Sequence, residues 1–452
     1  MAIYRVKFDA SGSNDGNSWE NAFTDLQSAI NTATSGDEIW VAAGIYKPGT
    51  ERTDSFQLKD GVSVYGGFAG NENSLNARDI KNNVTILSGS IGDENNKQDN
   101  SYTVVKFTNE NGTVILDGFT IQDGFSNKDA VNDINDNNKD DINNNGGGIH
   151  NQGNLTLRNV VVKENQANAD GGGIRNDGTL TVESSVISNN KTEDDGGGIR
   201  NNGALTIIDS TIANNESVGD SDTSGGGGLI NTGASATIIN STFSGNTAKN
   251  GGAIRNDTVL NLINSTLSGN TASESGGGLS NTANIDINTL PPIVNSAAQA
   301  TITNSTITNN TANNTSDEGT DSQVGGGIAN FAIANISNSI IAGNTGNDDF
   351  VDMISDTLKS FFSNLANLKS NSGGNNIIGN GEGVSGFTDG TNDDQIGTKT
   401  NPIDPLLDTL KDNGGAIKTH ALLAGSPAIN AGNNSNIALD TAELDGDNNV
   451  SE

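Results

Sequence analysis

The chain has 452 residues with 23 basic and 55 acidic side chains, which give a formal net charge of −32, and it contains no cysteine. This charge argues against nucleic acid and anionic membrane surfaces as partners, because both require clustered lysine and arginine. The lack of cysteine excludes disulfides, thiolate metal sites and cysteine nucleophiles. No apolar stretch approaches the ~18 residues that span a membrane. The N-terminal sequence lacks the apolar core of a signal peptide, so we expect any export signal beyond residue 452.

The first predicted element is a short helix over residues 23–34. Leu26, Ile30 and Ala33 fall on one face of this helix, at spacings of four and three residues. We expect the helix to cover the open end of a stack of strands, within an N-terminal region over residues 1–125. Residues 126–145 are acidic and rich in asparagine, and we predict that they form a loop insertion.

Residues 146–346 contain a repeat of about 25 residues. A glycine run, an apolar residue and, two positions later, an asparagine occur together seven times, with successive apolar residues 25, 25, 30, 25, 25 and 49 positions apart. These apolar residues are Ile149, Ile174, Ile199, Leu229, Ile254, Leu279 and Ile328. The longer spacings are a 25-residue unit plus insertions, which fall mostly before the glycine runs. We therefore expect the insertions to lie along one edge, which in repeat proteins often marks the binding side.

The repeat predicts a parallel β-helix. Further apolar residues follow at offsets of 6 and 8, which is the period-two signal of a strand. Strands this short bury a face only when successive coils stack about 4.8 Å apart into parallel sheets. A coil of about 25 residues fits three sheets, and the long runs of 3.6-residue period that a helical repeat needs are missing.

Two rows of asparagines are predicted at the corners of the coils. Asparagine tolerates the left-handed backbone conformation, and its amide can bond to the asparagine one coil away, so we interpret both rows as structural. The first row comprises Asn151, Asn176, Asn201, Asn231, Asn256, Asn281 and Asn330. The second row comprises Asn165, Asn190, Asn215, Asn246, Asn270, Asn310 and Asn344.

A second helix is predicted over residues 349–369. Phe350, Met353 and Ile354 begin a run of apolar residues at helical spacing, with Asp348 or Asp349 as the N-cap. We expect this amphipathic insertion to pack against the flank of the solenoid, and a dimer or partner contact is the alternative. Residues 347–452 would then contain the helix, the last coils and a closing segment.

Several segments resemble bacterial, often cyanobacterial, secreted or surface proteins of the right-handed parallel β-helix superfamily that includes pectate lyases. The similar segments are 9–19, 22–30, 36–44, 64–68, 116–121, the glycine-run repeats, 412–415 and 424–432. The resemblance covers nearly the whole chain. It implies one continuous all-β, single-stranded right-handed parallel β-helix, an extracellular or cell-surface location and a variable C-terminal anchor. It does not name a reaction, because a fold does not imply a function.

We assign no catalytic residue from the sequence. Lyases, hydrolases and epimerases of the superfamily carry characteristic catalytic motifs, and we identify none of these sets here; Asp348–Asp349 is a bare acidic pair. His150 and His420 are the only histidines, which leaves almost no material for a Ser–His–Asp triad or a histidine metal site.

One column of residues is a candidate binding site. His150, Arg175, Arg200 and Arg255 each follow the inward apolar residue of their unit, so alternation points them outward, one per coil. Guanidinium groups match carboxylates, which suggests binding of an acidic polysaccharide. The alternative is an outer face closed by ion pairs, for which the neighbouring acidic residues are Asp170, Asp177, Glu193, Asp194 and Asp195.

No cofactor is required by this interpretation, although Ca²⁺ binding is possible at acidic loops. The motifs at 133–137 and 445–449 are incomplete calcium loops, so the metal site is left unassigned. Two functions remain open. The first is a secreted or cell-surface structural or adhesive protein that binds carbohydrate or partner surfaces through the loops on one edge. The second is a polysaccharide lyase, hydrolase or epimerase acting on an acidic glycan. The sequence does not predict an oligomeric state.

Overall fold

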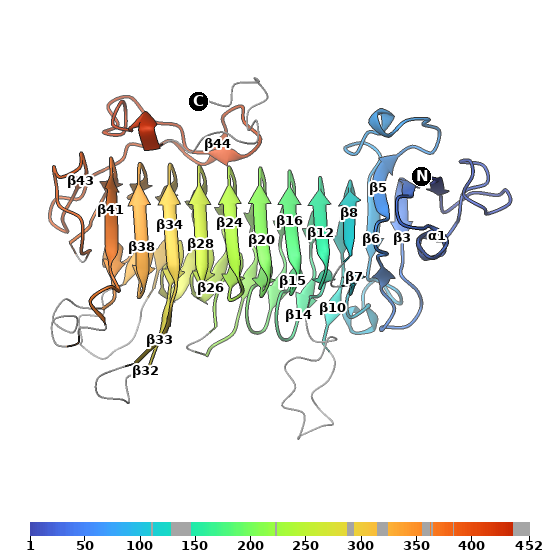
Figure 1. Ribbon diagram of the computed structural model, residues 1–452, viewed down its shortest axis with the longest axis horizontal. Coiled ribbons are helices and arrows are strands. Elements are labelled where there is room, and N and C mark those ends of the chain that lie inside the picture. The colour runs from blue at the N-terminus through green and yellow to red at the C-terminus, as the bar shows by residue number, and fades with distance from the viewer. Residues whose placement is uncertain are drawn as a thin grey trace. The chain divides into compact units, whose positions relative to one another are not determined.

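The computed structural model describes most of the chain, in ranges separated by short gaps. The described residues are 1–109, 112–127, 146–221, 224–286, 293–313, 324–354, 362, 365–382 and 384–436. The chain forms two compact units, of which unit 1 comprises Met1–Ala236 and Phe243–Lys249 and unit 2 comprises Thr237–Thr242 and Asn250–Glu452. Figure 1 shows that both units consist of parallel strands stacked side by side.

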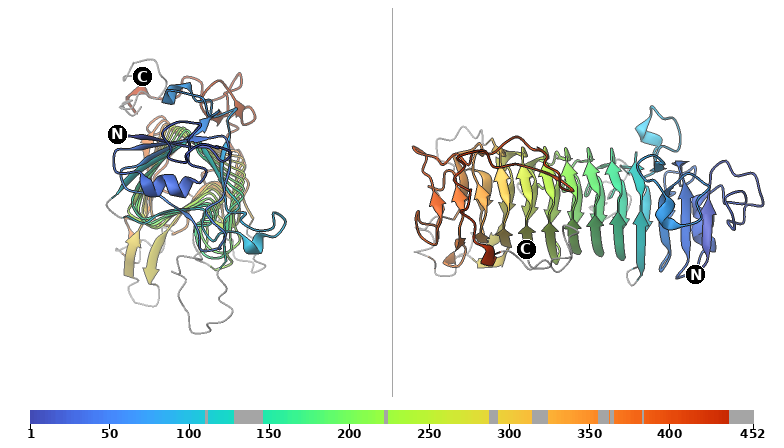
Figure 2. Two further views of the ribbon diagram at one scale, coloured as in Figure 1. Left: turned by 90° about the vertical axis from the view of Figure 1, so that its right-hand side faces the viewer. Right: turned by 90° about the horizontal axis from the view of Figure 1, so that it is seen from above.

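Unit 1 begins with strand β1 (Ile3–Val6) and the helix α1 (Leu26–Thr32), which matches the helix predicted over residues 23–34. The side chain of Asp25 caps α1 by accepting a hydrogen bond from the amide of Ser28 at 2.6 Å. Leu26 and Ile30 are buried against the first coil. In the end-on view of Figure 2, α1 (dark blue) lies across the end of the coils of unit 1, as expected of a cap.

The coils of unit 1 build four parallel sheets, which we name A to D. Sheet A contains β1, β2 (Glu38–Ala42), β5 (Ser63–Phe68), β8 (Thr113–Asp117), β12 (Asn154–Arg158), β16 (Thr179–Glu183) and β20 (Ala204–Ile208). Sheet B contains β3 (Gly44–Tyr46), β6 (Thr85–Ser88), β9 (Phe119–Gln122), β13 (Val161–Lys163), β17 (Val186–Ser188) and β21 (Thr211–Ala213). Sheet C contains β4 (Phe56–Gln57), β7 (Val105–Phe107), β11 (Ile149–Asn151), β15 (Ile174–Asn176), β19 (Ile199–Asn201) and β23 (Leu229–Asn231). Sheet D contains the two-residue strands β10 (Phe125–Ser126), β14 (Gln166–Ala167), β18 (Lys191–Thr192) and β22 (Glu216–Ser217).

Unit 2 repeats this arrangement. Its sheet A contains β28 (Val259–Ile263), β34 (Gln299–Thr303), β38 (Ile333–Ser337) and β41 (Ser370–Gly374). Its sheet B contains β29 (Thr266–Ser268), β35 (Thr306–Thr308), β39 (Ile340–Ile341), β42 (Ile377–Ile378) and β43 (Gln395–Ile396). Its sheet C contains β27 (Ile254–Asn256), β31 (Leu279–Asn281), β37 (Gly325–Asn330) and β40 (Asp348–Asp352), and its sheet D contains β30 (Thr271–Ser275) and β36 (Thr311–Ala312). Strands β24 (Ser235–Ile239), β25 (Thr242–Ser244) and β26 (Thr247–Asn250) each contribute residues to both units. Two antiparallel pairs are also present, β32 (Ala283–Asp286) with β33 (Ile293–Ala297) and β44 (Lys411–Asp412) with β45 (Lys418–Thr419). Short 3-10 helices occur at Leu75–Ala77, Lys97–Asp99 and Asn434–Asn436.

The register confirms the predicted stacking of the repeat. Ile149 is paired with Ile174, and Ile174 with Ile199, in successive parallel strands of sheet C. All three side chains are fully buried. The fold is therefore a parallel β-helix whose interior is filled by one aliphatic side chain above another. The short sheet D, at the corner between sheets B and C, adds to the three sheets that the repeat length predicts.

The asparagine rows form hydrogen-bonded ladders, as predicted. In unit 1 the side-chain amide of Asn151 donates to Asn176 Oδ1, and Asn176 donates to Asn201 Oδ1, each at 2.7 Å. The second row repeats the pattern, with Asn165 donating to Asn190 and Asn190 to Asn215. Each of these links points toward the later coil, so the amide dipoles in this part of each ladder are aligned.

In unit 2 the ladders end on aspartates, which the sequence analysis did not anticipate. Asn330 donates to Asp352 Oδ1 at 2.8 Å, and Asn344 donates to Asp349 Oδ1 at 2.9 Å. A third column ends with Asn376 donating to Asp394 Oδ1 at 3.0 Å. A carboxylate accepts at both oxygens, so it fits the end at which aligned amides present their N–H groups.

The prediction of a helix over residues 349–369 is wrong for the first residues of that range. Asp348–Asp352 is strand β40, which pairs with β37 so that Phe350 lies beside Ile328. Phe350 is fully buried, because it continues the interior aliphatic column. Ile354, Leu365 and Leu368 form a separate buried cluster. Stacking on the preceding coil therefore overrides the helical spacing of these residues, and residues 355–361 and 363–364 lie outside the described part of the chain.

We expect the two buried carboxylates Asp349 and Asp394 to respond differently to Asp→Asn substitution. Asp349 accepts from three N–H groups, the amides of Asn344 and Asn380 and the Asn344 side chain, so in Asp349→Asn an NH₂ group must face another N–H. Asp394 Oδ2 accepts from the Ser372 hydroxyl, and in Asp394→Asn this hydroxyl can turn its hydrogen away from the new NH₂ group, which a backbone N–H cannot do. Asp349→Asn should cost about 2–4 kcal/mol and Asp394→Asn about 1 kcal/mol. Urea unfolding measures both, and equal losses would contradict this account of the ladder ends.

Candidate functional site

The candidate site lies in unit 1, at the corner where each coil passes from sheet D through a glycine run into sheet C. We define the corner cluster as Asp170, Arg175, Asp194, Asp195 and Arg200. The aspartates come directly before the glycine runs at 171–173 and 196–198. The arginines are the outward-facing middle residues of β15 and β19, flanked by buried residues on both sides.

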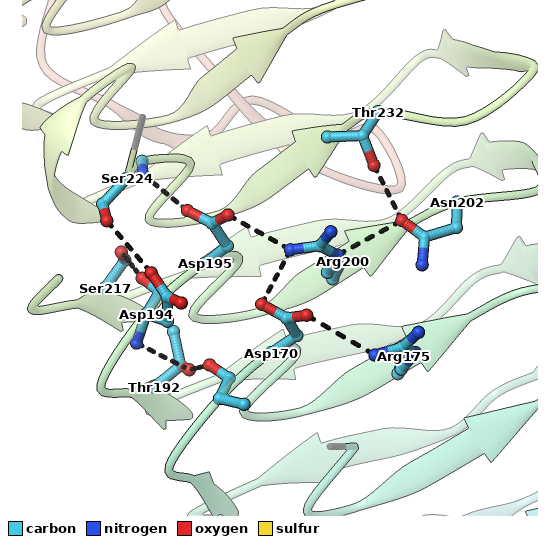
Figure 3. Close-up of polar contacts among 12 residues, drawn as sticks. Asp170, Arg175, Thr192, Asp194, Asp195, Arg200, Asn202, Ser217, Ser224 and Thr232 are labelled. Carbon is cyan, nitrogen blue, oxygen red and sulfur yellow. Dashed lines mark hydrogen bonds and ion pairs between the residues drawn. The ribbon is translucent and has the colours of Figure 1, made fainter. Parts of the chain in front are cut away.

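Asp170 bridges the two arginines (Figure 3). Its Oδ2 lies 3.4 Å from Arg175 Nη1 and its Oδ1 lies 2.7 Å from Arg200 Nη1. Arg200 Nη1 also lies 3.1 Å from Asp195 Oδ2. Because Arg175 and Arg200 are directly paired across neighbouring strands, their Cα atoms are only about 4.8 Å apart. The shared carboxylate offsets the repulsion between the two cations.

Asp177 forms a second hydrogen-bonded network, which includes Arg175 of the corner cluster. It accepts hydrogen bonds from His150 Nε2 at 2.8 Å, from Arg175 Nε at 2.9 Å and from the Asn202 side chain at 2.7 Å. Burial opposes ionisation of Asp177, but the bonds from His150 and Arg175 outweigh it and hold the pKa of this carboxyl well below its usual range. Asp177 is therefore ionised at neutral pH and fixes the orientation of the His150 and Arg175 side chains.

The pKa of Asp195 is shifted in the opposite direction, upward. Burial, together with the nearby carboxylates of Asp194 and Asp170, raises the pKa of Asp195 to about 7. The insertion that follows β22 contacts both aspartates of this pair. Ser224 Oγ donates to Asp194 Oδ1 and the amide of Gly225 donates to Asp195 Oδ1, each at 3.0 Å (Figure 3). The corner cluster thus holds a carboxyl group that exchanges its proton near neutral pH.

We expect Asp195→Asn to remove a pH dependence of stability. The pKa of Asp195 is raised in the folded chain, so this group stabilises the folded state below the unfolded value of about 3.9 and loses that contribution as pH rises through about 7. The wild type should therefore lose about 2–4 kcal/mol between pH 4 and pH 8 that Asp195→Asn retains. Urea unfolding across this pH range measures the difference, and parallel profiles for the two proteins would contradict the burial of this group.

The structure brings three of the four candidate binding residues together. His150, Arg175 and Arg200 occupy the same outward position in β11, β15 and β19. Arg255 lies in unit 2, where its Nε is 3.0 Å from Asp257 Oδ1. Of the five acidic neighbours named from the sequence, Asp170, Asp177 and Asp195 make ion pairs with Arg175 or Arg200.

Lys106 extends the same column and was missed. It is buried and is paired with His150 across β7 and β11. The glycine-run repeat begins only at residue 146, so a search on that motif does not reach Lys106. Aligning Val105-Lys106-Phe107 with Ile149-His150-Asn151 would have found it, because both triplets alternate inward and outward residues.

One insertion is described at the same corner. Of the segment predicted as a loop over residues 126–145, Ser126 is the last residue of β10, and residues 128–145 lie outside the described part of the chain. The insertion after β22 reaches Asp194 and Asp195, as described above. In unit 1 the edge predicted from the repeat is therefore also the edge that carries the ionic column.

Two searches of the described residues are negative. No group of three or more His, Cys, Asp or Glu side chains there is arranged to hold a metal ion. The calcium-like motif at 133–137 and that at 445–449 lie outside the described residues. No helix in the described ranges has the length and apolar character needed to cross a membrane.

Sequence comparison finds no matching family model and no matching curated protein. Among solved structures, the chain is similar to pectate lyase Pel9A, with 14% identity and a TM-score of 0.43, covering 78% of each chain. It is similar to a rhamnogalacturonan lyase, with 14% identity and a TM-score of 0.33, covering 75% of this chain and 87% of that one. It is also similar to the PL6 family alginate lyase AlyGC, with 12% identity and a TM-score of 0.34, covering 93% of this chain and 55% of that one. These proteins are parallel β-helices, and the strand pairing assigns this chain to the same fold class.

Proposed function

We propose that this chain is a secreted or cell-surface β-helix protein that binds carbohydrate at the corner cluster without transforming it. The observation that carries the proposal is the coincidence of two features on one edge of unit 1. The outward ionic column and the insertion after β22 both lie at the corner between sheets D and C. Two arginines in successive coils, about 4.8 Å apart, suit a linear polymer that presents acceptors at regular intervals.

The arginines retain donors for such a ligand. Nη1 and Nε of Arg175 and Arg200 contact the protein, whereas Nη2 of either residue makes no hydrogen bond or ion pair with the described residues. The side chains are 13% and 21% exposed. A guanidinium held on one side by aspartate is pre-oriented to bind a carboxylate or hydroxyl on its other side. Polysaccharides that carry carboxylates are therefore the first ligand class to test.

A glycan array tests the proposal. We expect the wild type to bind an acidic polysaccharide and Arg175→Ala/Arg200→Ala to bind it at least about tenfold more weakly, because two charge-assisted hydrogen-bonding groups are lost. Arg158→Ala is the matched control, since Arg158 is also in an outward ion pair, with Glu183 on sheet A at 2.8 Å. Equal binding by the double variant and the wild type would refute the site.

A second candidate function follows from Asp195. A carboxyl group with a pKa near 7 beside Asp170, whose carboxyl is bound by arginine, is a suitable general acid for cleaving a glycosidic bond. Incubation with pectate and alginate in the presence of Ca²⁺ tests this alternative. Release of reducing ends, or ultraviolet absorbance from unsaturated uronates, that disappears in Asp195→Asn would establish it. Neither signal in the wild type would reject it.

A further inference from the structure

A second constellation lies on sheet B of unit 2, where the C-terminal segment returns along the coils. Residues 403–433 run back over unit 2 (Figure 1). His420, just after β45, hydrogen-bonds with Ser268 at the end of β29. The Thr242 hydroxyl fixes the same turn by donating to the Lys418 carbonyl at 2.7 Å. Two residues 152 positions apart in sequence are thereby brought into contact.

The hydrogen bonds define the tautomer of His420. Its Nδ1 lies 2.5 Å from the backbone carbonyl oxygen of Asp408, and its Nε2 lies 2.8 Å from Ser268 Oγ. A carbonyl oxygen only accepts, so Nδ1 must carry the proton of the neutral ring. Nε2 is then the acceptor, and the Ser268 hydroxyl donates to it. This is the polarity required of a serine nucleophile and its general base, with a third group orienting the base.

The surroundings of Ser268 fit a small electrophile. The next residue, Gly269, has a φ of +67°, and no atom lies within 4 Å of the position that a Cβ would occupy. Its amide makes only a long hydrogen bond, 3.4 Å, to the carbonyl of Thr308. That amide is the donor we assign to stabilise an oxyanion on a substrate bound at Ser268. The Ser268 side chain is itself largely covered, which restricts access to small groups.

We propose that Ser268 and His420 form a nucleophile–base pair for acyl transfer from short-chain esters such as acetyl esters. Ser268 Oγ bonds to the ester carbonyl carbon while its proton passes to His420 Nε2. The bond from that carbon to the leaving alcohol then breaks, and the alcohol takes the proton from Nε2. Water repeats the same steps on the acyl-serine, which releases the carboxylic acid and restores the hydroxyl. The pair is independent of the corner cluster.

A serine-directed fluorophosphonate probe tests the proposal on the full chain. We expect mass spectrometry to find the probe on Ser268, and we expect hydrolysis of 4-nitrophenyl acetate to be lost in Ser268→Ala. His420→Gln keeps a side chain that can hydrogen-bond to Ser268 but cannot act as the base. It should preserve the thermal melting temperature and lower labelling at least about a hundredfold.

Ser244→Ala is the matched control, because Ser244 is the last residue of β25, the equivalent position in its own strand. This variant should label and hydrolyse like the wild type. Labelling of Ser268 no faster than that of other serines in the wild type, or unchanged labelling in a folded His420→Gln, would overturn the proposal. Either result would leave the Ser268–His420 contact with a structural role only, that of holding the C-terminal segment in place.

Discussion

We expect Asn190→Ala to destabilise the chain by about 3–5 kcal/mol, which is a large part of the stability of a typical domain. The Asn190 side chain is 1% exposed and sits in the middle of a ladder. Its amide donates to Asn215 Oδ1 and to the Val162 carbonyl, and its oxygen accepts from the Asn165 backbone and side chain. Alanine would leave several of these buried partners unpaired, where water cannot reach them.

Urea unfolding followed by circular dichroism measures this loss as a shift of the midpoint. Asn154→Ala is the control, because Asn154 is an exposed asparagine on the outer face of sheet A. The control should change stability by less than about 0.5 kcal/mol. If both variants unfolded at the same urea concentration, the ladders would not contribute to stability and our interpretation of the asparagine rows would fail.

The second large effect is expected from Gly197→Ala, in the middle of a glycine run. A Cβ at this position would lie 2.5 Å from the backbone carbonyl carbon and oxygen of Glu216 in the next coil. Backbone atoms of a hydrogen-bonded coil cannot rotate away as a side chain would, so the coils must separate locally. We expect a loss of about 3 kcal/mol, at the upper end of overpacking effects.

Hydrogen exchange resolves where this loss occurs. Amides of β19 and β22 should lose protection in Gly197→Ala, because β19 follows the glycine run and β22 contains Glu216, which the added Cβ would meet. Gly415→Ala is the control, since the nearest atom to its added Cβ is 4.0 Å away. Unchanged protection in Gly197→Ala would show that the glycine runs are not required for close approach of the coils.

The sequence predicts the fold because each coil repeats the same physical constraints. Ile149 and its equivalents must be buried, the glycines must admit a neighbouring backbone, and Asn151 and its equivalents must find an amide one coil away. Each constraint recurs at about 25 residues, and only stacked coils satisfy them together. The capping helix α1 was predictable for a similar reason, because its apolar face has no other place to be buried.

The predicted helix at 349–369 fails because local spacing competes with stacking. Phe350 matches both a helical face and the inward position of a strand, and the aliphatic column ending at Ile328 selects the strand. The aspartates that end the ladders carry no repeat signal, since each occurs once, at the last coil of its column. Only a coil count that includes irregular spacings would have placed Asp349 beneath Asn344.

Of the candidate sites, too, some parts could be predicted from the sequence and others could not. The pairing of Arg175 with Arg200 follows directly from the 25-residue period, and their acidic partners are close in sequence. The bridging role of Asp170 needs side-chain geometry that the period does not specify. The Ser268–His420 contact depends on how the C-terminal segment folds back, which no repeat encodes. Sites built from neighbouring coils are thus predictable here, and the site built across a long separation is not.

Engineered thiol pairs test the stacking of coils most directly, because the chain contains no cysteine of its own. Thr156 and Thr181 are direct partners on the outer face of sheet A, whereas Thr206 lies one strand further on. The reagent dibromobimane becomes fluorescent when both of its arms have reacted with nearby thiols. We predict strong fluorescence for Thr156→Cys/Thr181→Cys, about 4.8 Å apart, and little for Thr156→Cys/Thr206→Cys at about twice that distance. Equal signals from the two pairs, or none from the first, would contradict the parallel β-helix on which the site and the proposed functions rest.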